Sequence, residues 1–383
     1  MLDNIWLTAA IWIGIAFIAS LISIRIGITV ALIEIFLGML AGNLFGMHET
    51  TQWIDFFALL GSLTLTFLAG AEIDPETFKA NLKPSLIMGS LSCAIPFIGV
   101  WLFTEFVLGW EIQQAQIAGI ALSTTSVAII YSVVIEKGVS DTSLGKLMLT
   151  SVFITDLGTV LMLGVLFATY NSWMIFFIIA LAAAFFITPY FTKKLIKTFK
   201  ASKISEPEIK FVFLILFLLA GLATAANTVP ILPSFVMGIA LAGLFVNDKT
   251  LMHRVRTISF SVFTPFYFIK AGLYISLKTV AVSYGLISIL LLLKVIFKYA
   301  GIYPTTRILK YNAKTAHYTS LLMSTGITFG TIAALFGLTN NIIDQNQYTV
   351  LVTVVILSAL IPTIIAQKFF EPSLAEMSNR KEI

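Results

Sequence analysis

Asp156 is a carboxylate in the middle of the apolar run LGKLMLTSVFITDLGTVLMLGVLFATY, with Thr155 directly before it. An ionised carboxylate at the centre of a lipid bilayer costs about 2.5–3.5 kcal/mol or more. Burial favours the protonated, neutral form, and a bound cation would neutralise the ionised form. A carboxyl group in this position is therefore suited to exchanging a proton for a cation.

Lysines also fall inside apolar ranges. Lys294 and Lys298 are four residues apart, which places them on one face of a helix. We interpret them, together with Lys270 in TPFYFIKAGLYISL, as charge compensation for buried acids, with Lys298 opposite Asp156. The alternative for Lys294 and Lys298 is that their ammonium groups extend to the membrane surface. The acids that could pair with Lys270 are Glu34, Glu72 and Glu105.

Composition fixes the class of protein. Hydrophobic residues make up 58% of the 383 residues and charged residues 11%, with a mean hydropathy of +0.97. Such values, with apolar runs of roughly 20 residues, predict an all-α polytopic membrane protein. A single cysteine, Cys93, excludes an intrachain disulfide, and no P-loop, zinc or nucleophile motif is present. We therefore predict a protein that is not an enzyme and has no cofactor.

The distribution of Lys and Arg predicts the topology. If the N-terminus is outside, Lys278 alone lies in an outer loop, three lysines lie within spans, and all others lie on the inner side. This asymmetry predicts an odd number of spans in a cell-membrane protein with a cytoplasmic C-terminus, and it explains the net charge of +5 without nucleic acid. We predict about thirteen spans, near residues 5–24, 26–46, 51–72, 84–108, 113–135, 144–169, 172–191, 210–227, 230–246, 258–276, 279–303, 316–338 and 347–367.

The spans divide into two similar halves. We predict a single transmembrane domain over residues 1–383, with one repeat at about 5–169, a linker helix at about 172–210 and a second repeat at about 210–369. A short cytoplasmic tail, 370–383, would follow. One additional span separates the two halves of six spans, so the halves would be inverted relative to each other in the membrane.

Two polar interruptions occupy matching positions in these repeats. LSTTS at 122–126 lies in the fifth span, and MSTGITFG at 323–330 lies in the twelfth. Inverted repeats with paired broken helices place a binding site where the breaks cross, near the middle of the membrane. The alternative is that small residues let these helices pack closely. The residues expected to support the site are Ser123, Thr124, Thr125, Ser126, Ser324, Thr325 and Gly326.

The ordered set of motifs resembles a known family. GIALSTTSVAIIYSVVIEKGVSDTSLGKLMLTSVFITDLGTV is similar to the signature of monovalent cation:proton antiporters, in the second branch of that superfamily. ALIEIFLGMLAGN and LTFLAGAEID resemble its early helices, and LPSFVMGIALAG, PFYFIKAGL and LLMSTGITFG its later ones. The resemblance covers nearly the whole chain.

This resemblance implies a homodimer of thirteen-helix protomers, in which a mobile core slides against a dimerisation domain. It also implies that Asp156 binds an alkali cation (Na+, K+ or Li+) and a proton in turn, and that Thr125 lines the nearby break. Strongly electrogenic relatives have a second carboxylate where this chain has Thr155. With one carboxylate, we predict electroneutral exchange, with Ser126 and Thr155 also near the cation. Thr155 would hydrogen-bond nearby backbone or a bound water, and the alternative for it is simple helix packing.

Other functions remain open at this stage. A symporter of organic anions could use the same inverted-repeat fold, since Lys298 and the two helix breaks would suit an anion, although Asp156 would oppose it. A membrane sensor could use the same cavity. The choice between Na+ and K+ depends on site geometry that the sequence does not give.

Overall fold

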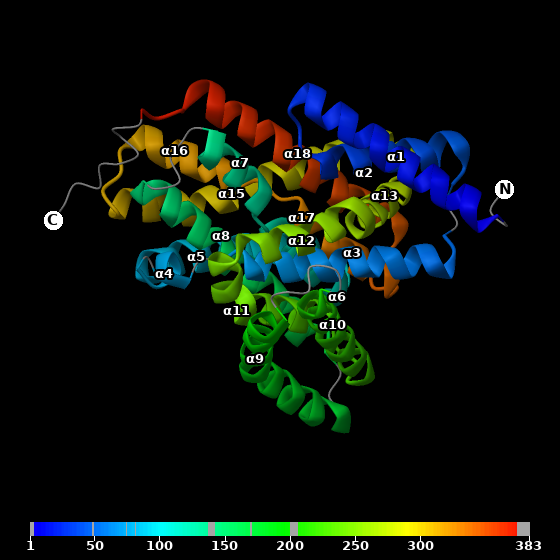
Figure 1. Cartoon of the computed structure of the whole chain (residues 1–383). Helices are drawn as coiled ribbons and strands as arrows, with labels where there is room; N and C mark the ends of the chain where they lie inside the picture. Colours follow the sequence, from blue (N-terminus) through cyan, green and yellow to red (C-terminus); the bar gives the residue numbers. More distant parts are fainter. Residues whose placement is uncertain are drawn as a thin grey trace. The chain divides into compact units, whose positions relative to one another are not determined.

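The computed structural model describes residues 4–47, 50–73, 75–80, 82–136, 142–168, 171–199 and 206–373. Within these ranges every regular element is a helix (Figure 1). The elements are α1 (Ile5–Ile26), α2 (Val30–Phe45), α3 (Gln52–Ala71), α4 (Pro75–Ala80), α5 (Leu82–Phe106), α6 (Ile112–Ser123), α7 (Val127–Glu136), α8 (Ser143–Leu166), α9 (Ser172–Phe199), α10 (Pro207–Ala225), α11 (Ile231–Asn247), α12 (Lys249–Ile258), the π-helix η1 (Ser259–Phe263), α13 (Thr264–Leu273), α14 (Leu277–Val282), α15 (Tyr284–Ile308), α16 (Ala313–Leu322), α17 (Thr328–Thr339) and α18 (Gln345–Phe369).

Many of these helices are long and apolar enough to cross a bilayer. Among the described residues, eight helices meet this condition: α1, α3, α5, α8, α9, α10, α15 and α18. Helices α2, α11 and α17 are shorter and also apolar. The protein is therefore an all-helical, multi-pass membrane protein, as the composition predicted.

The two expected helix interruptions are present. Helix α6 ends at Ser123 and α7 begins at Val127, while α16 ends at Leu322 and α17 begins at Thr328. The other predicted spans each coincide mainly with one helix, with two exceptions: 258–276 overlaps the end of α12, η1 and α13, and 279–303 overlaps both α14 and α15. Both predicted interruptions thus coincide with the runs of Ser, Thr and Gly.

Several predicted boundaries were displaced. The range 279–303 begins instead at Tyr284 and continues to Ile308, because the separate helix α14 precedes it and is capped by the side chain of Ser276. Within the predicted linker, about 172–210, α9 runs from Ser172 to Phe199, and α10 starts at Pro207, a residue suited to a first helical turn. Residues 200–205, the tail from 374 onward and His48 lie outside the described residues.

The chain divides into two compact units. The first comprises residues 1–52, 80–159 and 268–383, and the second comprises residues 53–79 and 160–267. Helix α8 contributes to both, because the division falls after Thr159. Asp156, Lys294, Lys298 and both helix breaks belong to the first unit.

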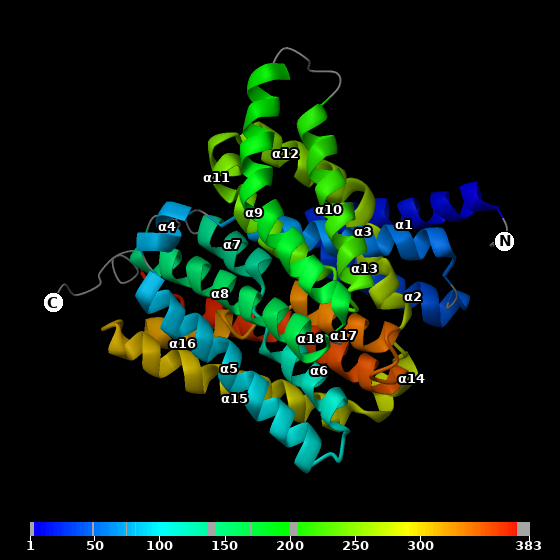
Figure 2. The ribbon, with the colours of Figure 1, turned by 90° about the horizontal axis from the view of Figure 1, so that it is seen from below.

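Close helix packing organises the first unit. Helix α5 lies beside α6 and α15, and α15 also lies beside α16 and α18 (Figure 2). At Gly301 of α15, an added Cβ would be 2.8 Å from the Leu91 carbonyl oxygen of α5. Gly38 of α2 and Gly272 of α13 bring those two helices into direct backbone contact, at Ile269 and Ile35 respectively. Small residues therefore hold these helices together at the closest approach that backbones allow.

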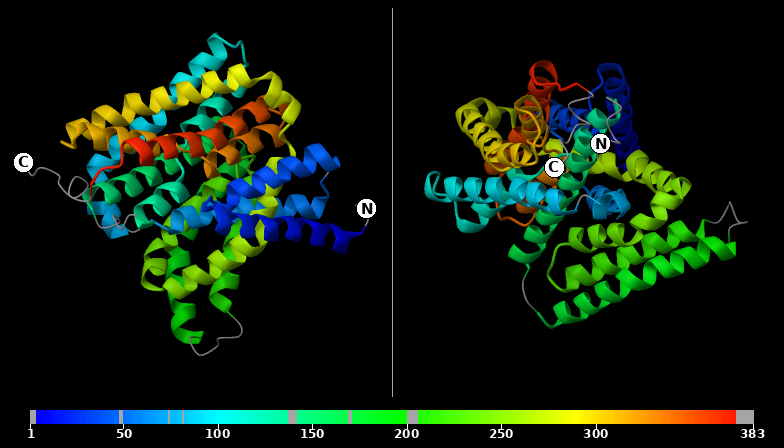
Figure 3. Two further views of the ribbon diagram at one scale, coloured as in Figure 1. Left: turned by 90° about the horizontal axis from the view of Figure 1, so that it is seen from above. Right: turned by 90° about the vertical axis from the view of Figure 1, so that its left-hand side faces the viewer.

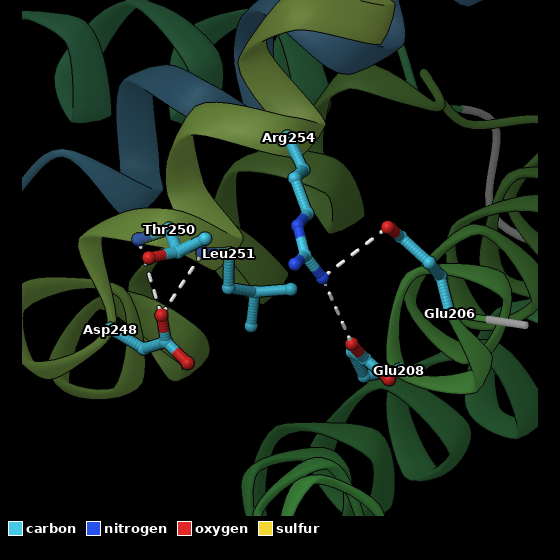
Figure 4. A network of polar contacts seen from close by, with 6 residues as sticks. All are labelled: Glu206, Glu208, Asp248, Thr250, Leu251 and Arg254. Carbon is cyan, nitrogen blue, oxygen red and sulfur yellow. Dashed lines mark hydrogen bonds and ion pairs between the residues drawn. The ribbon is translucent and has the colours of Figure 1, made fainter. Parts of the chain in front are cut away.

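The second unit contains an antiparallel pair, α9 and α10, which lie side by side (Figure 3). Its core includes Phe67, Val212, Leu241 and Val255 from four different helices. Ion pairs add to this packing at the start of α10. The Arg254 guanidinium of α12 points to the carboxylates of Glu206 and Glu208, at 3.3 and 3.6 Å (Figure 4).

Candidate functional site

Asp156 lies on α8, completely buried. Its exposed fraction is 0%, and neither carboxylate oxygen has a hydrogen-bond partner. A buried carboxylate without partners is costly when ionised, since nothing replaces the water that it has lost. The Asp156 carboxyl group is therefore available to bind an ion or to hold a proton.

The two helix breaks meet in the first unit. The Thr125 hydroxyl donates a hydrogen bond to the Met323 carbonyl oxygen at 2.9 Å, and the Ser126 N–H donates to the Thr325 carbonyl oxygen at 3.0 Å. Helix α17 also packs against α6. Each interruption thus provides a partner for backbone groups that the other leaves free, which a helix break inside a membrane requires.

Lys298 connects this junction to α5 and to Asp156. Its ammonium group, 0% exposed, donates to the Ser92 Oγ at 2.9 Å and to the Thr125 Oγ1 at 2.8 Å. The charges of Lys298 and Asp156 lie close enough to act on each other. Hydroxyl groups thus make the direct contacts of the Lys298 ammonium, and its pairing with Asp156 stays a prediction.

Lys294 lies on the same face of α15 and is equally buried. Its Nζ has no hydrogen-bond partner. A Cβ added at Gly326 would be 2.6 Å from this Nζ and 2.7 Å from the Thr124 Oγ1, so Lys294 ends at the α16–α17 break. Lys298 is the group whose charge acts on it. The structure therefore places two lysines beside the junction of the breaks, and neither extends to the surface.

The Ser126 Oγ accepts a hydrogen bond from the Ile129 N–H at 3.5 Å, and four other hydroxyl groups at the breaks donate to carbonyl groups of their own helices. These bonds, 2.6–3.0 Å long, run from Ser123 to Ile120, Thr124 to Ala121, Ser324 to Ser320, and Thr325 to Leu322. Such bonds satisfy carbonyl groups at the ends of α6 and α16, where the helical ladder stops. These side chains shape the breaks in this arrangement.

Thr155, expected near the cation, makes contacts of helix packing. Its hydroxyl group donates to the Ser151 carbonyl oxygen at 3.0 Å and lies 3.3 Å from the Gly89 carbonyl oxygen. Gly89 is on α5, where an added Cβ would be 2.7 Å from the Ser151 carbonyl oxygen. Thr155 therefore joins α8 to α5 directly beside Asp156.

Lys270 belongs to a different helix from Lys294 and Lys298. It lies on α13 and is 7% exposed. Of its three candidate partners, Glu72 pairs with Arg256 at 3.5 Å and Glu105 accepts a hydrogen bond from the Trp101 indole at 2.6 Å. The third, Glu34 on α2, is buried, and its Oε2 lacks a hydrogen-bond partner.

Ser92 and the Met323 carbonyl oxygen are parts of the site that the sequence analysis did not identify. A signal for Ser92 exists, because small residues recur on one face of α5: Ser85, Gly89, Ser92, Cys93 and Pro96 are all buried there. A stripe of this spacing indicates a helix face in contact with other helices. It does not indicate which side chain accepts the hydrogen bond from Lys298.

The junction of the two breaks presents oxygen atoms. They are the hydroxyl group of Thr125 and the carbonyl groups of Met323 and Thr325. Oxygen ligands suit hard cations such as alkali ions. Within the described ranges, no three His, Cys, Asp or Glu side chains gather in a way that could hold a metal ion.

Sequence comparison gives the family. Residues 13–371 match a family model described as sodium/hydrogen exchanger, transmembrane. The chain belongs to this family. The resemblance to monovalent cation:proton antiporters is thereby confirmed, and this sodium/hydrogen exchanger family member is a multi-pass membrane transporter and not an enzyme.

Individual relatives agree with this assignment. The chain is 26% identical to the Na(+)/H(+) antiporter of Enterococcus hirae, over 92% of this chain and 94% of that protein. It is 24% identical to the probable Na(+)/H(+) antiporter 3 of Methanocaldococcus jannaschii, over 87% and 89% respectively. The solved structure of the sodium proton antiporter MjNhaP1 from the same archaeon at pH 8 matches with a TM-score of 0.68 and 14% identity, covering 96% of this chain and all of that one. The exchanger therefore has the fold of MjNhaP1.

Proposed function

We propose that this exchanger transports a monovalent cation, Na+ or K+, in exchange for protons by alternating access, with Asp156 binding cation and proton in turn. The observation that carries the proposal is the state of Asp156. It is fully buried, both oxygens lack partners, and it lies within electrostatic reach of Lys298, which binds the junction of the two helix breaks. The names of relatives support both ions, because they include Na(+)/H(+) antiporters and a K(+)/H(+) antiporter of Alkalimonas amylolytica.

Burial of Asp156 explains why the two ions exchange. Protonated Asp156 is neutral and can be enclosed without water. Ionised Asp156 requires a cation, which oxygen atoms of Thr125, Ser126 and the interrupted helices would help to coordinate. The empty, ionised site is too costly to enclose. Only the two occupied forms therefore cross, and the gradients of the two ions become coupled.

Thr125 has a second task in this cycle. Its hydroxyl oxygen accepts a hydrogen bond from Lys298 while the same group donates to the Met323 carbonyl oxygen. A cation that used Thr125 as a ligand would compete with the Lys298 ammonium for the same oxygen. Binding of the cation would therefore displace Lys298 from Thr125, towards Ser92 or towards the Asp156 charge.

One proton for one cation is the simplest stoichiometry. A single carboxylate carries the exchange, because Thr155 occupies the neighbouring position and its hydroxyl group binds carbonyl oxygens. Transport would then be electroneutral. Reconstituted exchange measured with and without an imposed membrane potential tests this step, since a strong dependence on voltage would contradict it.

We further propose thirteen spans in two inverted repeats, at about 5–169 and 210–369, within one transport domain. The N-terminus would lie outside, the C-terminus in the cytoplasm, and two copies would form a homodimer. The paired helix breaks and the match to the whole MjNhaP1 chain support the repeats. Cysteine labelling from either side of the membrane, after removal of Cys93, would test the orientation.

The decisive experiment measures exchange in everted vesicles with a pH-sensitive dye. Adding Na+, K+ or Li+ should release protons from vesicles with the unaltered protein. Asp156→Asn should abolish the response while the protein still inserts and folds, and Asp248→Asn, which changes a helix cap to an equally good one, should leave it intact. No response of the unaltered protein to any of the three cations would contradict cation exchange and favour symport of an organic anion.

A further inference from the structure

Lys294 is a buried base for which the proposed exchange cycle has no use. It is 0% exposed and its Nζ lacks a hydrogen-bond partner. Lys298, one helical turn away, is equally buried but has two hydroxyl acceptors and the Asp156 charge nearby. The two lysines therefore face different electrostatic conditions within one cluster.

Burial without a hydrogen-bond partner disfavours a charge on the Lys294 amine. An ammonium ion that is removed from water must be compensated by acceptors or by an opposite charge, and it is disfavoured when it is not. The charge that acts on Lys294 comes from Lys298 and has the same sign. A neutral amine, which needs no counter-ion, avoids this penalty.

Other charged and titratable groups lie on the helices that pack against α15. Helix α15 packs against α5, α6, α14, α16 and α18. Lys298 remains the group whose charge acts on Lys294. The other charged or titratable side chains described on these helices are Lys83, Cys93, Glu105, Lys278, Tyr284, Tyr299, Tyr303, Arg307, Lys314, His317, Tyr318, Tyr348 and Lys368.

The position of Lys294 connects its charge to the helix break. Its Nζ lies against Gly326, between the end of α16 and the start of α17, and beside Thr124 of the other break. The start of α17 is the positive end of a helix dipole, which opposes a second positive charge there. A proton on Lys294 would therefore draw the side chain towards water and disturb the junction of the breaks.

We propose that Lys294 is a positioning residue that makes closure of the ion site depend on pH. It takes up a proton while the site is open to water, and it must release that proton before the site closes around either ion. This proposal rests on exchange at Asp156. With Lys294 neutral, the enclosed site has the same charge with a proton or with a monovalent cation, because each neutralises one carboxylate. The Lys294 proton is consequently not transported, and it slows the cycle at acidic pH.

Three variants of Lys294 test the proposal. Lys294→Met and Lys294→Gln remove the titratable group at similar length, whereas Lys294→Arg keeps a charge at every accessible pH. Lys278→Met, at an exposed lysine on α14, is the control. The maximal rate of exchange is measured in proteoliposomes over a range of pH at saturating cation, so that direct competition between proton and cation at Asp156 does not contribute.

In Lys294→Met and Lys294→Gln, we expect the maximal rate to fall at a pH that is lower by about one unit or more. One unit is a tenfold change in proton concentration. Lys294→Arg should fold and exchange at less than about a tenth of the normal rate at every pH. Lys278→Met should keep the normal profile. A purely structural role for Lys294 would lower the rate evenly and leave the profile in place.

An unchanged acidic decline in the Met and Gln variants would overturn the proposal, as would normal exchange by Lys294→Arg. If one neutral variant does not fold, the other provides the same comparison. These outcomes differ from failure of the proposed function, in which the unaltered protein itself shows no cation-dependent proton movement.

Discussion

The Thr125 hydroxyl donates a hydrogen bond to the Met323 carbonyl oxygen at 2.9 Å, across 198 residues of sequence. The same oxygen accepts a hydrogen bond from Lys298. One side chain of the first helix break therefore holds both the second break and the buried ammonium beside Asp156.

Thr125→Val should reduce both stability and exchange. The substitution keeps the shape of the side chain but leaves the Met323 carbonyl oxygen and the Lys298 ammonium each without one partner, at a cost of about 1–3 kcal/mol in the free energy of unfolding. Thermal unfolding of the purified protein measures the first effect and dye-based exchange the second. Thr104→Val is the matched control, since the Thr104 hydroxyl bonds only within α5. Equal stability of the two variants would contradict this role of Thr125.

Gly326→Ala should disturb the α16–α17 break. The new methyl group would be 2.6 Å from the Lys294 Nζ and 2.7 Å from the Thr124 Oγ1, so at least one of them must move. We expect a loss of about 1–3 kcal/mol in the free energy of unfolding and slower exchange. Adding Lys294→Ala should restore part of the stability, because the Lys294 Nζ then no longer occupies that space. If the double variant loses more free energy of unfolding than the two single variants lose together, the contact is contradicted.

Gly272→Ala should separate α2 from α13. The added carbon would overlap the Ile35 carbonyl oxygen, which is backbone and cannot turn away. We expect a loss of about 2 kcal/mol or more, visible as a lower melting temperature. Gly14→Ala on α1 is the control, since nothing lies within 4 Å of its added carbon, and there helix propensity predicts a gain of about 0.5–1 kcal/mol. If both variants behave alike, close packing does not hold these helices together.

Arg254→Gln should have a small effect. The side chain pairs with Glu206 and Glu208, but Arg254 and Glu206 are 35% and 32% exposed, and solvent weakens such pairs. We expect a change in the free energy of unfolding of at most about 1 kcal/mol, smaller still at high salt. Melting temperatures in low and high salt measure it. A large loss that salt does not affect would show that these pairs have a greater part in the second unit.

Much of the fold could be predicted from the sequence because long apolar runs have few alternatives in a bilayer. The exact helix limits could not be predicted. The predicted start at 258 is the last residue of α12, the π-helix η1 follows it, and capping by Ser276 creates a separate α14. These boundaries depend on local hydrogen bonds, which hydropathy does not record.

Some residues of the candidate site could be predicted from the sequence and others could not. Asp156, Lys294 and Lys298 could be found in the sequence because charges in apolar runs are costly and therefore conspicuous. Ser92 could not, because a serine in a membrane helix costs little, and its partner, Lys298, is 206 residues away in the chain. Thr155 was expected near the cation because it precedes Asp156, but its hydroxyl group faces the Ser151 and Gly89 carbonyl oxygens.

The bonds between the two helix breaks also have a consequence for biosynthesis. Helices α6 and α7 enter the membrane long before the ribosome has made α16 and α17. Until then the α6–α7 break lacks the partner that the Ser126 N–H will find at Thr325, and an unpaired backbone group in lipid costs several kcal/mol. A nascent chain that ends before α15 should therefore keep this segment near water or against the insertion machinery. Assembly of the transport site then becomes one of the last events in the folding of the polypeptide.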